Sequence, residues 1–263
     1  GKMPFIVAEG IRSAGERVFL IAIKGVTSPR LLEYADEVLW LYVTQIGKAI
    51  RECRKRRASK IIMAGRVSHN AIFSISPWNM DFTSLRVWWS LPDKRPDTIL
   101  SGIADAFVRK GIHVMSSVHY ISSYLAKEGV LTKKKPSKAV SKDIDFGVKI
   151  AKAMGDMDVG QTVVVKDKAT VAIEAMEGTD QCLERAGTVA GEGCVVVKMP
   201  KPGQDMRFDV PTVGVNTIEK LHKIKAAALA IESERTLLID EETIDVANKY
   251  GIVIVSLPQK VTE

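Results

Sequence analysis

Short apolar runs alternate with amphipathic runs along most of this chain, and this alternation constrains its fold more than any other feature. Residues 17–25 (RVFLIAIKG) and 38–43 (VLWLYV) are short and rich in aliphatic side chains, which is typical of buried strands. Residues 45–58 (QIGKAIRECRKRRA) carry apolar side chains at helical spacing. A strand at 60–65 and a helix at 96–111, bounded by proline and glycine, continue the series. The pattern predicts a mostly parallel, Rossmann-like sheet covered by helices.

The composition changes at KEGVLTKKKPSKAV, where lysine, glycine and proline replace the periodic pattern. We therefore predict an N-terminal domain over 1–128, a basic linker over 129–141 and a C-terminal catalytic domain over 142–263. The second domain begins with a helix at 142–158. Residues 161–175 then predict a β-hairpin that turns at Lys166-Asp167-Lys168. The expected fold class is α/β, with two α/β domains of which the second is mixed.

The net charge of +7 favours anionic partners such as nucleotides, nucleic acid or an acidic membrane surface. Two runs concentrate the charge, RECRKRR at 51–57 and KKKPSK at 133–138, and solvated surface is the default interpretation of both. Aromatic residues do not interleave with them, so a stacking platform for nucleic acid is poorly supported. No apolar run reaches the ~18–20 residues of a membrane span, and residues 1–15 do not predict a signal peptide. Three separated cysteines suggest structural thiols.

The segment IIMAGRVSHN places a glycine turn and an arginine at the carboxyl end of a predicted strand. Ligands of open α/β sheets bind at this end, and free amides, a hydroxyl and a guanidinium suit a phosphate. The signal is weak by itself, because every α/β protein has several such turns. His69 alone is more often a surface residue than a catalyst.

The segment VAIEAMEGTDQCLERAG ends a strand with acids and opens a helix with Thr179 and Asp180. Helix capping explains one of these two residues. It does not explain Glu174 and Glu177, which close an otherwise apolar strand. Acids near a helix N-terminus, which attracts phosphate, would need a metal ion or a sugar hydroxyl to face.

The segment KMPKPGQDMRFDVPTVG places Asp205 and Asp209 on either side of Arg207, within a stretch that Pro202 and Pro211 mark as a loop. Two such carboxylates can hold Mg²⁺ together with substrate phosphate oxygens, and the guanidinium can neutralise phosphate charge. An Asp–Arg ion pair that ties down a surface loop explains the same residues about equally well.

Taken together, these segments resemble the LpxI family, the UDP-2,3-diacylglucosamine pyrophosphatases of lipid A biosynthesis. The resemblance spans nearly the whole chain, through GKMP, MAGRVS, PDTIL, VHYISSYLAKEGVLT, DVGQTVVVK, IEAMEGTD and KPGQDMRFDVPTVG. The spacing of GTD from GQ and from RFDVPT is its most specific part. Relatives begin with an apolar strand and a glycine-rich turn before this chain's first residues, so the order of the first sheet stays open.

The resemblance implies an active site between two α/β domains. It also implies hydrolysis of UDP-2,3-diacylglucosamine to 2,3-diacylglucosamine 1-phosphate (lipid X) and UMP, dependent on Mg²⁺ or another divalent cation. Water is expected to attack the sugar-side phosphorus. Asp209 matches the catalytic aspartate, and Asp205 and Asp209 are the implied metal ligands. The implied substrate-binding residues are Met3, Gly65, Arg66, Val67, Ser68, Gln161, Thr162, Gly178, Thr179, Asp180 and Arg207.

Three other functions remain open at this point. A non-catalytic uridine-nucleotide-binding regulator would use the same scaffold. A dehydrogenase is disfavoured because no G-x-G-x-x-G follows a predicted strand, and the basic runs alone would suggest a nucleic-acid binder. The expected location is cytoplasmic, peripheral to the anionic inner membrane, with no nucleic-acid partner and with a homodimer as one option.

Overall fold

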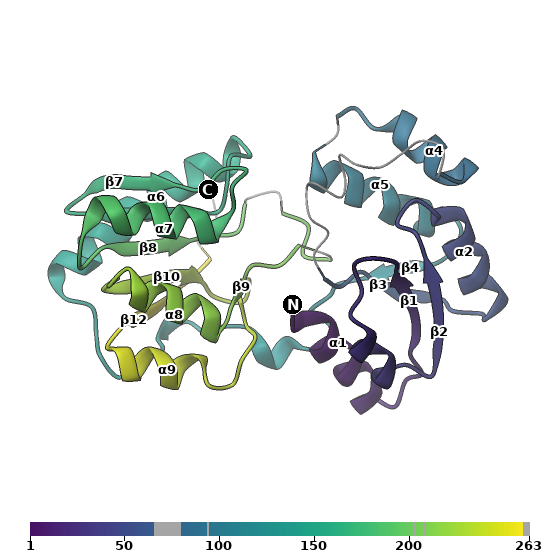
Figure 1. Cartoon of the computed structure of the whole chain (residues 1–263), viewed down its shortest axis with the longest axis horizontal. Helices are drawn as coiled ribbons and strands as arrows, with labels where there is room; N and C mark the ends of the chain where they lie inside the picture. The colour runs from purple at the N-terminus through teal and green to yellow at the C-terminus, as the bar shows by residue number, and fades with distance from the viewer. Residues whose placement is uncertain (66–79, 94, 202–203, 208, 260–263) are drawn as a thin grey trace. The chain divides into compact units, whose positions relative to one another are not determined.

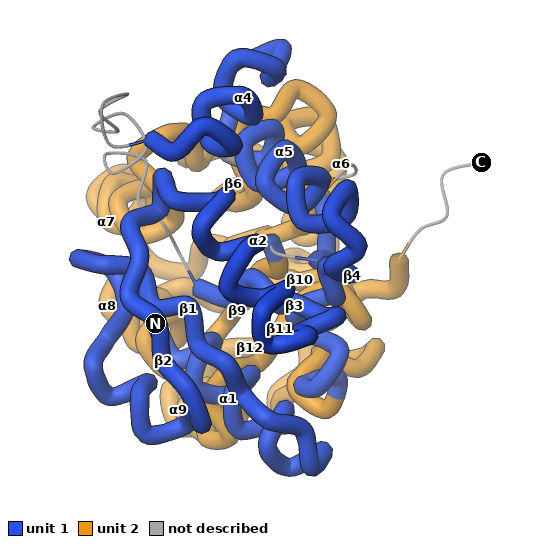
Figure 2. The backbone as a smooth tube through the Cα atoms, turned by 90° about the vertical axis from the view of Figure 1, so that its right-hand side faces the viewer, with its two compact units in different colours: residues 1–122, 205–209 blue, residues 123–204, 210–263 orange. Residues whose placement is uncertain are grey.

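The computed structural model describes residues 1–65, 80–93, 95–201, 204–207 and 209–259. The chain divides into two compact units, coloured separately in Figure 2. Unit 1 contains Gly1–Ser122 and Asp205–Asp209, and unit 2 contains Ser123–Gln204 and Val210–Glu263. The polypeptide therefore enters unit 2 after residue 122, returns to unit 1 for five residues, and then completes unit 2.

Unit 1 is built from short parallel strands with helices packed against them (Figure 1). Among the described residues, β1 pairs with β2 and β3 pairs with β4, both in parallel. A helix that was not predicted, α1, occupies the first residues, with Pro4 in its first turn, where a missing N–H costs nothing. The elements are α1 (Met3–Ser13), β1 (Phe19–Ile23), a 3₁₀ helix (Pro29–Tyr34), β2 (Glu37–Leu41), α2 (Ile46–Lys55), β3 (Lys60–Ile62), α4 (Phe82–Ser90), α5 (Pro96–Val108) and β4 (His113–Met115).

The core of unit 1 forms where the apolar stripes of α2, α4 and α5 meet the strands. Ile46, Ile50 and Cys53 of α2 pack with Val87 of α4 and Phe107 of α5 in one buried cluster. The spacing of the α2 residues is the helical periodicity from which that helix was predicted. The sequence signal and the packing therefore have the same cause.

Unit 2 contains, among its described residues, a six-stranded mixed sheet of order β5-β12-β10-β8-β6-β7. Strands β8, β10 and β12 run parallel, whereas β6 and β7 form an antiparallel hairpin and β5 pairs antiparallel to β12. The elements are β5 (Gly129–Val130), α6 (Lys138–Asp156), β6 (Thr162–Lys166), β7 (Ala169–Ile173), α7 (Thr179–Ala190), β8 (Val195–Lys198), β9 (Thr212–Val213), α8 (Val215–Lys223), β10 (Ala228–Glu232), β11 (Leu237–Leu238), α9 (Thr243–Tyr250) and β12 (Val253–Leu257).

Both faces of this sheet are buried, which explains its nearly continuous apolar strands. Val163 and Val165 pack on the side of α6, whereas Val164 packs on the side of α7, α8 and α9 (Figure 1). Alternate side chains of a strand point to opposite faces, so a strand covered on both faces needs apolar residues throughout. The predicted α/β class, with a mixed second domain, is confirmed.

The boundary between the units differs from the one expected from composition. The expected linker, 129–141, lies inside unit 2, where Gly129–Val130 pairs with β12 and the first turn of α6 begins at Lys138. Lys133 N donates to Asn248 Oδ1 at 2.8 Å. Lysine and proline therefore marked an exposed connection, but backbone pairing holds that connection to one unit.

No described helix is long and apolar enough to cross a bilayer. The three cysteines are free and buried. Burial raises the pKa of the Cys182 thiol to about 11, so this thiol is not poised as a nucleophile.

Candidate functional site

Residues Asp205–Asp209 lie against the carboxyl end of β4 in unit 1. Ser116 Oγ donates to the carbonyl of Met206 at 2.9 Å, and Ser117 N donates to the carbonyl of Arg207 at 2.9 Å. Both serines directly follow the last residue of β4. The segment thus lies where ligands of parallel α/β sheets bind, although its neighbours in sequence belong to unit 2.

Asp205 and Arg207 form a tight ion pair within this segment. The Arg207 Nε lies 3.0 Å from Asp205 Oδ1 and 2.9 Å from Oδ2, and the Arg207 backbone N–H donates to Oδ1 at 2.9 Å. Burial acts to raise the pKa of Asp205, but the hydrogen bonds from Arg207 outweigh it and hold that pKa below its ordinary value. The carboxylate is therefore ionised at neutral pH and holds the guanidinium in place.

Asp209 closes the same turn, because its backbone N–H donates to the carbonyl of Asp205 at 3.0 Å. It is half-buried. The described residues contain no group of three or more His, Cys, Asp or Glu side chains that would form a ready metal cage. One or two carboxylates suit Mg²⁺, which keeps several waters and takes its other ligands from substrate phosphates. Both carboxylate oxygens of Asp205 already accept from Arg207.

The other predicted residues of unit 1 are only partly described. Gly65 has a φ of 115°, and a Cβ at this position would lie 3.3 Å from Pro4 Cγ. The turn after β3 thus lies against the start of α1, where the predicted Met3 is the first helical residue. Arg66, Val67 and Ser68 lie outside the described residues.

A second set of predicted residues meets in unit 2, where the β6–β7 hairpin opens toward the N-terminus of α7. Thr179 is at its centre. Its Oγ1 donates to Glu174 Oε1 at 2.9 Å and lies 3.5 Å from Thr162 Oγ1, and Lys198 Nζ donates to it at 3.3 Å. Glu174 Oε2 is buried and has no hydrogen-bond partner among the described residues. The hydrophobic strands thus end in a compact cluster of hydroxyls, one carboxylate and one cation.

The first turn of α7 adds charge beside this cluster. Asp180 forms an ion pair with Lys220 of α8. Gly178 precedes the helix with a φ of 84° and offers no side-chain cap. A glycine is suited to that positive φ, and it places no side chain of its own beside the first amides of α7.

The two acids that capping could not explain have different surroundings. Glu177 pairs with Arg185 at 2.8 Å and accepts from the backbone N–H of Ala175 at 3.1 Å, so its contacts are structural. Only Glu174 points toward the polar cluster through Thr179. The predicted Gln161 flanks the cluster, and its carbonyl accepts from Met199 N at 2.9 Å.

Sequence reasoning did not select Lys198, Lys220 or Ser116, which the structure brings to these two sets. Lys198 is the last residue of β8, a cation that ends a run of buried valines. That contrast is a usable signal, because a strand that ends in a charged residue often delivers that residue to the sheet edge. Ser116 gave no comparable signal, since its partner is 90 residues away in the sequence.

Lys201 and Gln204, which precede Asp205, are held by polar contacts within unit 2. Lys201 pairs with Asp158 at 2.5 Å, and its backbone N–H donates to Gln204 Oε1 at 2.9 Å. Arg235 donates to the carbonyl of Lys201 at 3.3 Å. These contacts anchor the chain immediately before it enters unit 1.

Comparison with known proteins agrees with this architecture. The LpxI N-terminal domain matches residues 1–124, and the LpxI C-terminal domain matches residues 127–255. The UDP-2,3-diacylglucosamine pyrophosphatase LpxI of Caulobacter vibrioides is 28% identical over 273 residues, which cover 99% of this chain and 96% of that protein. Because matches to both LpxI domains follow one another along almost the whole chain, the protein belongs to the LpxI family.

Proposed function

We propose that this protein hydrolyses UDP-2,3-diacylglucosamine to 2,3-diacylglucosamine 1-phosphate and UMP. The observation that carries this proposal is the match of both LpxI domains, in order, to one chain whose relative is named for that substrate. The reaction is the cleavage of a phosphoric anhydride by water. The enzyme would therefore be a pyrophosphatase of lipid A biosynthesis.

The cluster in unit 2 offers the groups that a charged, hydroxyl-rich substrate needs. Lys198 and the first amides of α7 can donate to phosphate oxygens. Glu174 Oε2, which has no partner within the described ranges, can accept a hydrogen bond from a ribose or glucosamine hydroxyl. We assign substrate binding to this cluster, with Thr179 as the residue that positions Glu174 and Lys198.

The segment in unit 1 offers the reactive groups. Asp209 is the carboxylate that we assign to orienting the attacking water or to binding a divalent cation. Arg207, held by Asp205, offsets the negative charge of the diphosphate. Asp205 is then chiefly a positioning residue, and it would contact a metal ion only by sharing oxygens that already accept from Arg207.

When bound, Mg²⁺ would neutralise charge on the diphosphate and on the leaving group. Asp209 is the described side chain that we propose to hold it, with phosphate oxygens and water as the remaining ligands. The test is removal of the ion. Activity should disappear in EDTA and return when Mg²⁺ is added in excess.

The diacylated substrate also suggests where the protein acts. We propose that it works in the cytoplasm as a peripheral protein of the inner membrane. The net charge of +7 supports this, since each well-placed cation contributes about 1 kcal/mol to binding an anionic surface.

The decisive experiment is hydrolysis in ¹⁸O-labelled water. Attack at the sugar-side phosphorus places the label in the diacylglucosamine 1-phosphate, and attack at the other phosphorus places it in UMP.

Asp209→Ala should lower turnover by roughly 10²-fold or more, which is the scale of losing a positioned catalytic group. Asp245→Ala, which removes an exposed aspartate from α9, is the matched control and should retain normal turnover.

Two results would contradict this function. Near-normal turnover by a folded Asp209→Ala variant would remove that residue from the mechanism. Binding of uridine nucleotides by the unmodified protein without any Mg²⁺-dependent hydrolysis would favour a regulatory role instead.

A further inference from the structure

Helix α4 exposes two large aromatic side chains on one face. Phe82 is 80% exposed and Trp89 is 78% exposed, and the exposed Arg86 lies between them. Positions i, i+4 and i+7 share one face of a helix, and the buried Ser84 and Val87 lie on the opposite face. A single exposed apolar residue needs no explanation, but two aromatics around one cation on a nine-residue helix indicate a binding surface.

The helix that presents this face is fixed in place. Asp81 accepts from the backbone N–H of Ser84 at 2.9 Å and from that of Lys48 at 3.0 Å, so one carboxylate caps both α4 and α2. Ser84 Oγ accepts from the backbone N–H of Ile46 at 3.0 Å in the buried interface. Helix α4, which carries Phe82 and Trp89, is thus fixed at the edge of unit 1 beside α5 (Figure 1).

Two exposed cations lie on the side of α2 that faces α4. A Cβ at Gly47 would lie 2.6 Å from Thr83 Oγ1, which shows how closely the two helices approach there. Arg51 and Arg54 follow Gly47 at i+4 and i+7, so they lie on that same side of α2. Both are exposed, and neither they nor Arg86 form an ion pair within the described part of the chain.

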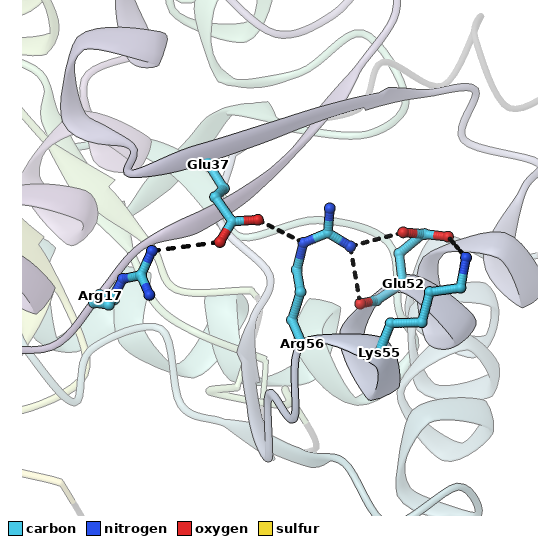
Figure 3. Close-up of polar contacts among 5 residues, drawn as sticks. All are labelled: Arg17, Glu37, Glu52, Lys55 and Arg56. Carbon is cyan, nitrogen blue, oxygen red and sulfur yellow. Dashed lines mark hydrogen bonds and ion pairs between the residues drawn. The ribbon is translucent and has the colours of Figure 1, made fainter.

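The cations on the other side of α2 are neutralised. Arg56 binds Glu37 of β2 at 2.8 Å and Glu52 at 2.7 Å, Lys55 binds Glu52 at 2.8 Å, and Arg17 reaches Glu37 (Figure 3). The basic run at 51–57 is thus divided by its surroundings. Carboxylates satisfy its β2 side, whereas Arg51 and Arg54 on its α4 side form no ion pair with the described residues.

We propose that unit 1 docks on an anionic lipid bilayer through a surface that we call the α4 face. It comprises Phe82, Arg86 and Trp89 of α4 together with Arg51 and Arg54 on the side of α2 that faces α4. Aromatic side chains enter the interfacial region of a bilayer, and arginines next to them bind lipid phosphates. Both aromatic side chains are largely exposed, so they are free to enter a soft bilayer. Docking rests on the proposed function only for its biological reason, a lipid substrate, because the exposed aromatics and arginines are present whatever the protein hydrolyses.

The test uses the full-length protein and extruded vesicles without substrate. We expect sedimentation with vesicles of 30% phosphatidylglycerol in phosphatidylcholine and none with phosphatidylcholine alone. Binding should weaken as salt rises. Trp89 should move to a less polar environment, so tryptophan emission should shift to shorter wavelength on binding, and Trp89→Phe should remove most of that shift.

Matched variants distinguish vesicle binding through the α4 face from attraction by the net charge of the protein. Phe82→Ser/Trp89→Ser should lower the vesicle partition coefficient at least about tenfold, and Arg51→Glu/Arg54→Glu/Arg86→Glu about a hundredfold. The controls change equivalent residues of unit 2. They are Met157→Ser/Val189→Ser, at 70% and 69% exposure, and Lys142→Glu/Lys149→Glu/Lys223→Glu at exposed lysines. Circular dichroism establishes that each variant is folded.

The outcomes are distinct. Loss of binding confined to the α4 variants supports the proposal, whereas equal losses in the controls would reduce the effect to net charge and overturn it. Absence of vesicle binding, or tighter binding to single-stranded DNA that needs the same residues, would also overturn it. Hydrolysis of substrate dispersed in neutral detergent should be unchanged in the α4 variants. If neither the unmodified protein nor any variant hydrolyses the substrate in detergent, the proposed activity is contradicted, and the vesicle-binding result is unaffected.

Discussion

The tip of the β6–β7 hairpin depends on a carboxylate from another element, and its removal has a calculable consequence. Asp143 of α6 accepts from the backbone N–H of Asp167 at 3.0 Å and from that of Lys168 at 2.7 Å. These two turn residues have φ values of 52° and 58°, in the left-handed region. Such a turn matches the twist of a hairpin, but without glycine or asparagine it is strained. Asp143 offsets that strain.

The magnitude follows from the two hydrogen bonds. A hydrogen bond to a charged group contributes about 1.5–3 kcal/mol. Asp143 is buried, but the two turn residues are exposed, so water can replace part of the interaction with their amides. The two bonds together would contribute about 3–6 kcal/mol, and because water replaces part of this, we expect Asp143→Ala to lower the free energy of unfolding by about 2–3 kcal/mol, at or below the low end of that sum. Asp143→Asn keeps one acceptor oxygen and should lose about half as much. Lys168→Gly should instead stabilise the protein by up to about 1 kcal/mol.

Urea unfolding followed by far-ultraviolet circular dichroism measures these differences, with Asp145→Ala on the same helix as the exposed control. All four tryptophans precede residue 123, so their emission reports unit 1 separately. Hydrogen exchange should show faster exchange of the Lys168 amide in Asp143→Ala. The free energy of unfolding of Asp143→Ala could instead lie within about 0.5 kcal/mol of that of the unmodified protein, with unchanged exchange of the Lys168 amide. In that case the carboxylate does not hold the turn.

Two further changes test other parts of the structure. Hydrogen bonds from Lys55 and Arg56 lower the pKa of Glu52 to about 2, so its stabilising contribution is complete above the ordinary pKa of 4.5 and is lost as the pH falls through about 2. Glu52→Gln should therefore melt at a lower temperature than the unmodified protein at pH 7, and the difference should shrink below pH 4.5; a difference that does not change with pH would contradict this ion pair. A Cβ at Gly160 would overlap the backbone carbonyl of Glu174, so Gly160→Ala should cost about 1–3 kcal/mol and lower turnover by displacing Glu174, and unchanged melting would show that the backbone adjusts freely.

Local sequence signals were sufficient for most individual elements. Helix α2 and the β6–β7 hairpin were predicted because the periodicity or turn residues of each lie within at most about fifteen consecutive positions. The start of α6 shows the limit of such signals, since Ser137 caps a helix that begins four residues before the predicted one. The motifs RFDVPT and GTD, read together, indicated the family that the domain matches then showed.

The candidate site depended on contacts that no local pattern records. Residues 205–209 belong to unit 1 because Ser116 and Ser117 bind their carbonyls, and these contacts join positions about 90 residues apart. The sequence predicted that Asp205 and Arg207 would either pair or face a ligand, and the structure shows that they pair. Thr179 and Lys198 likewise meet only because α7 and β8 pack in one unit. Periodicity determines which face of an element is buried, but only tertiary packing decides which polar ends meet, because that choice depends on strand order and register.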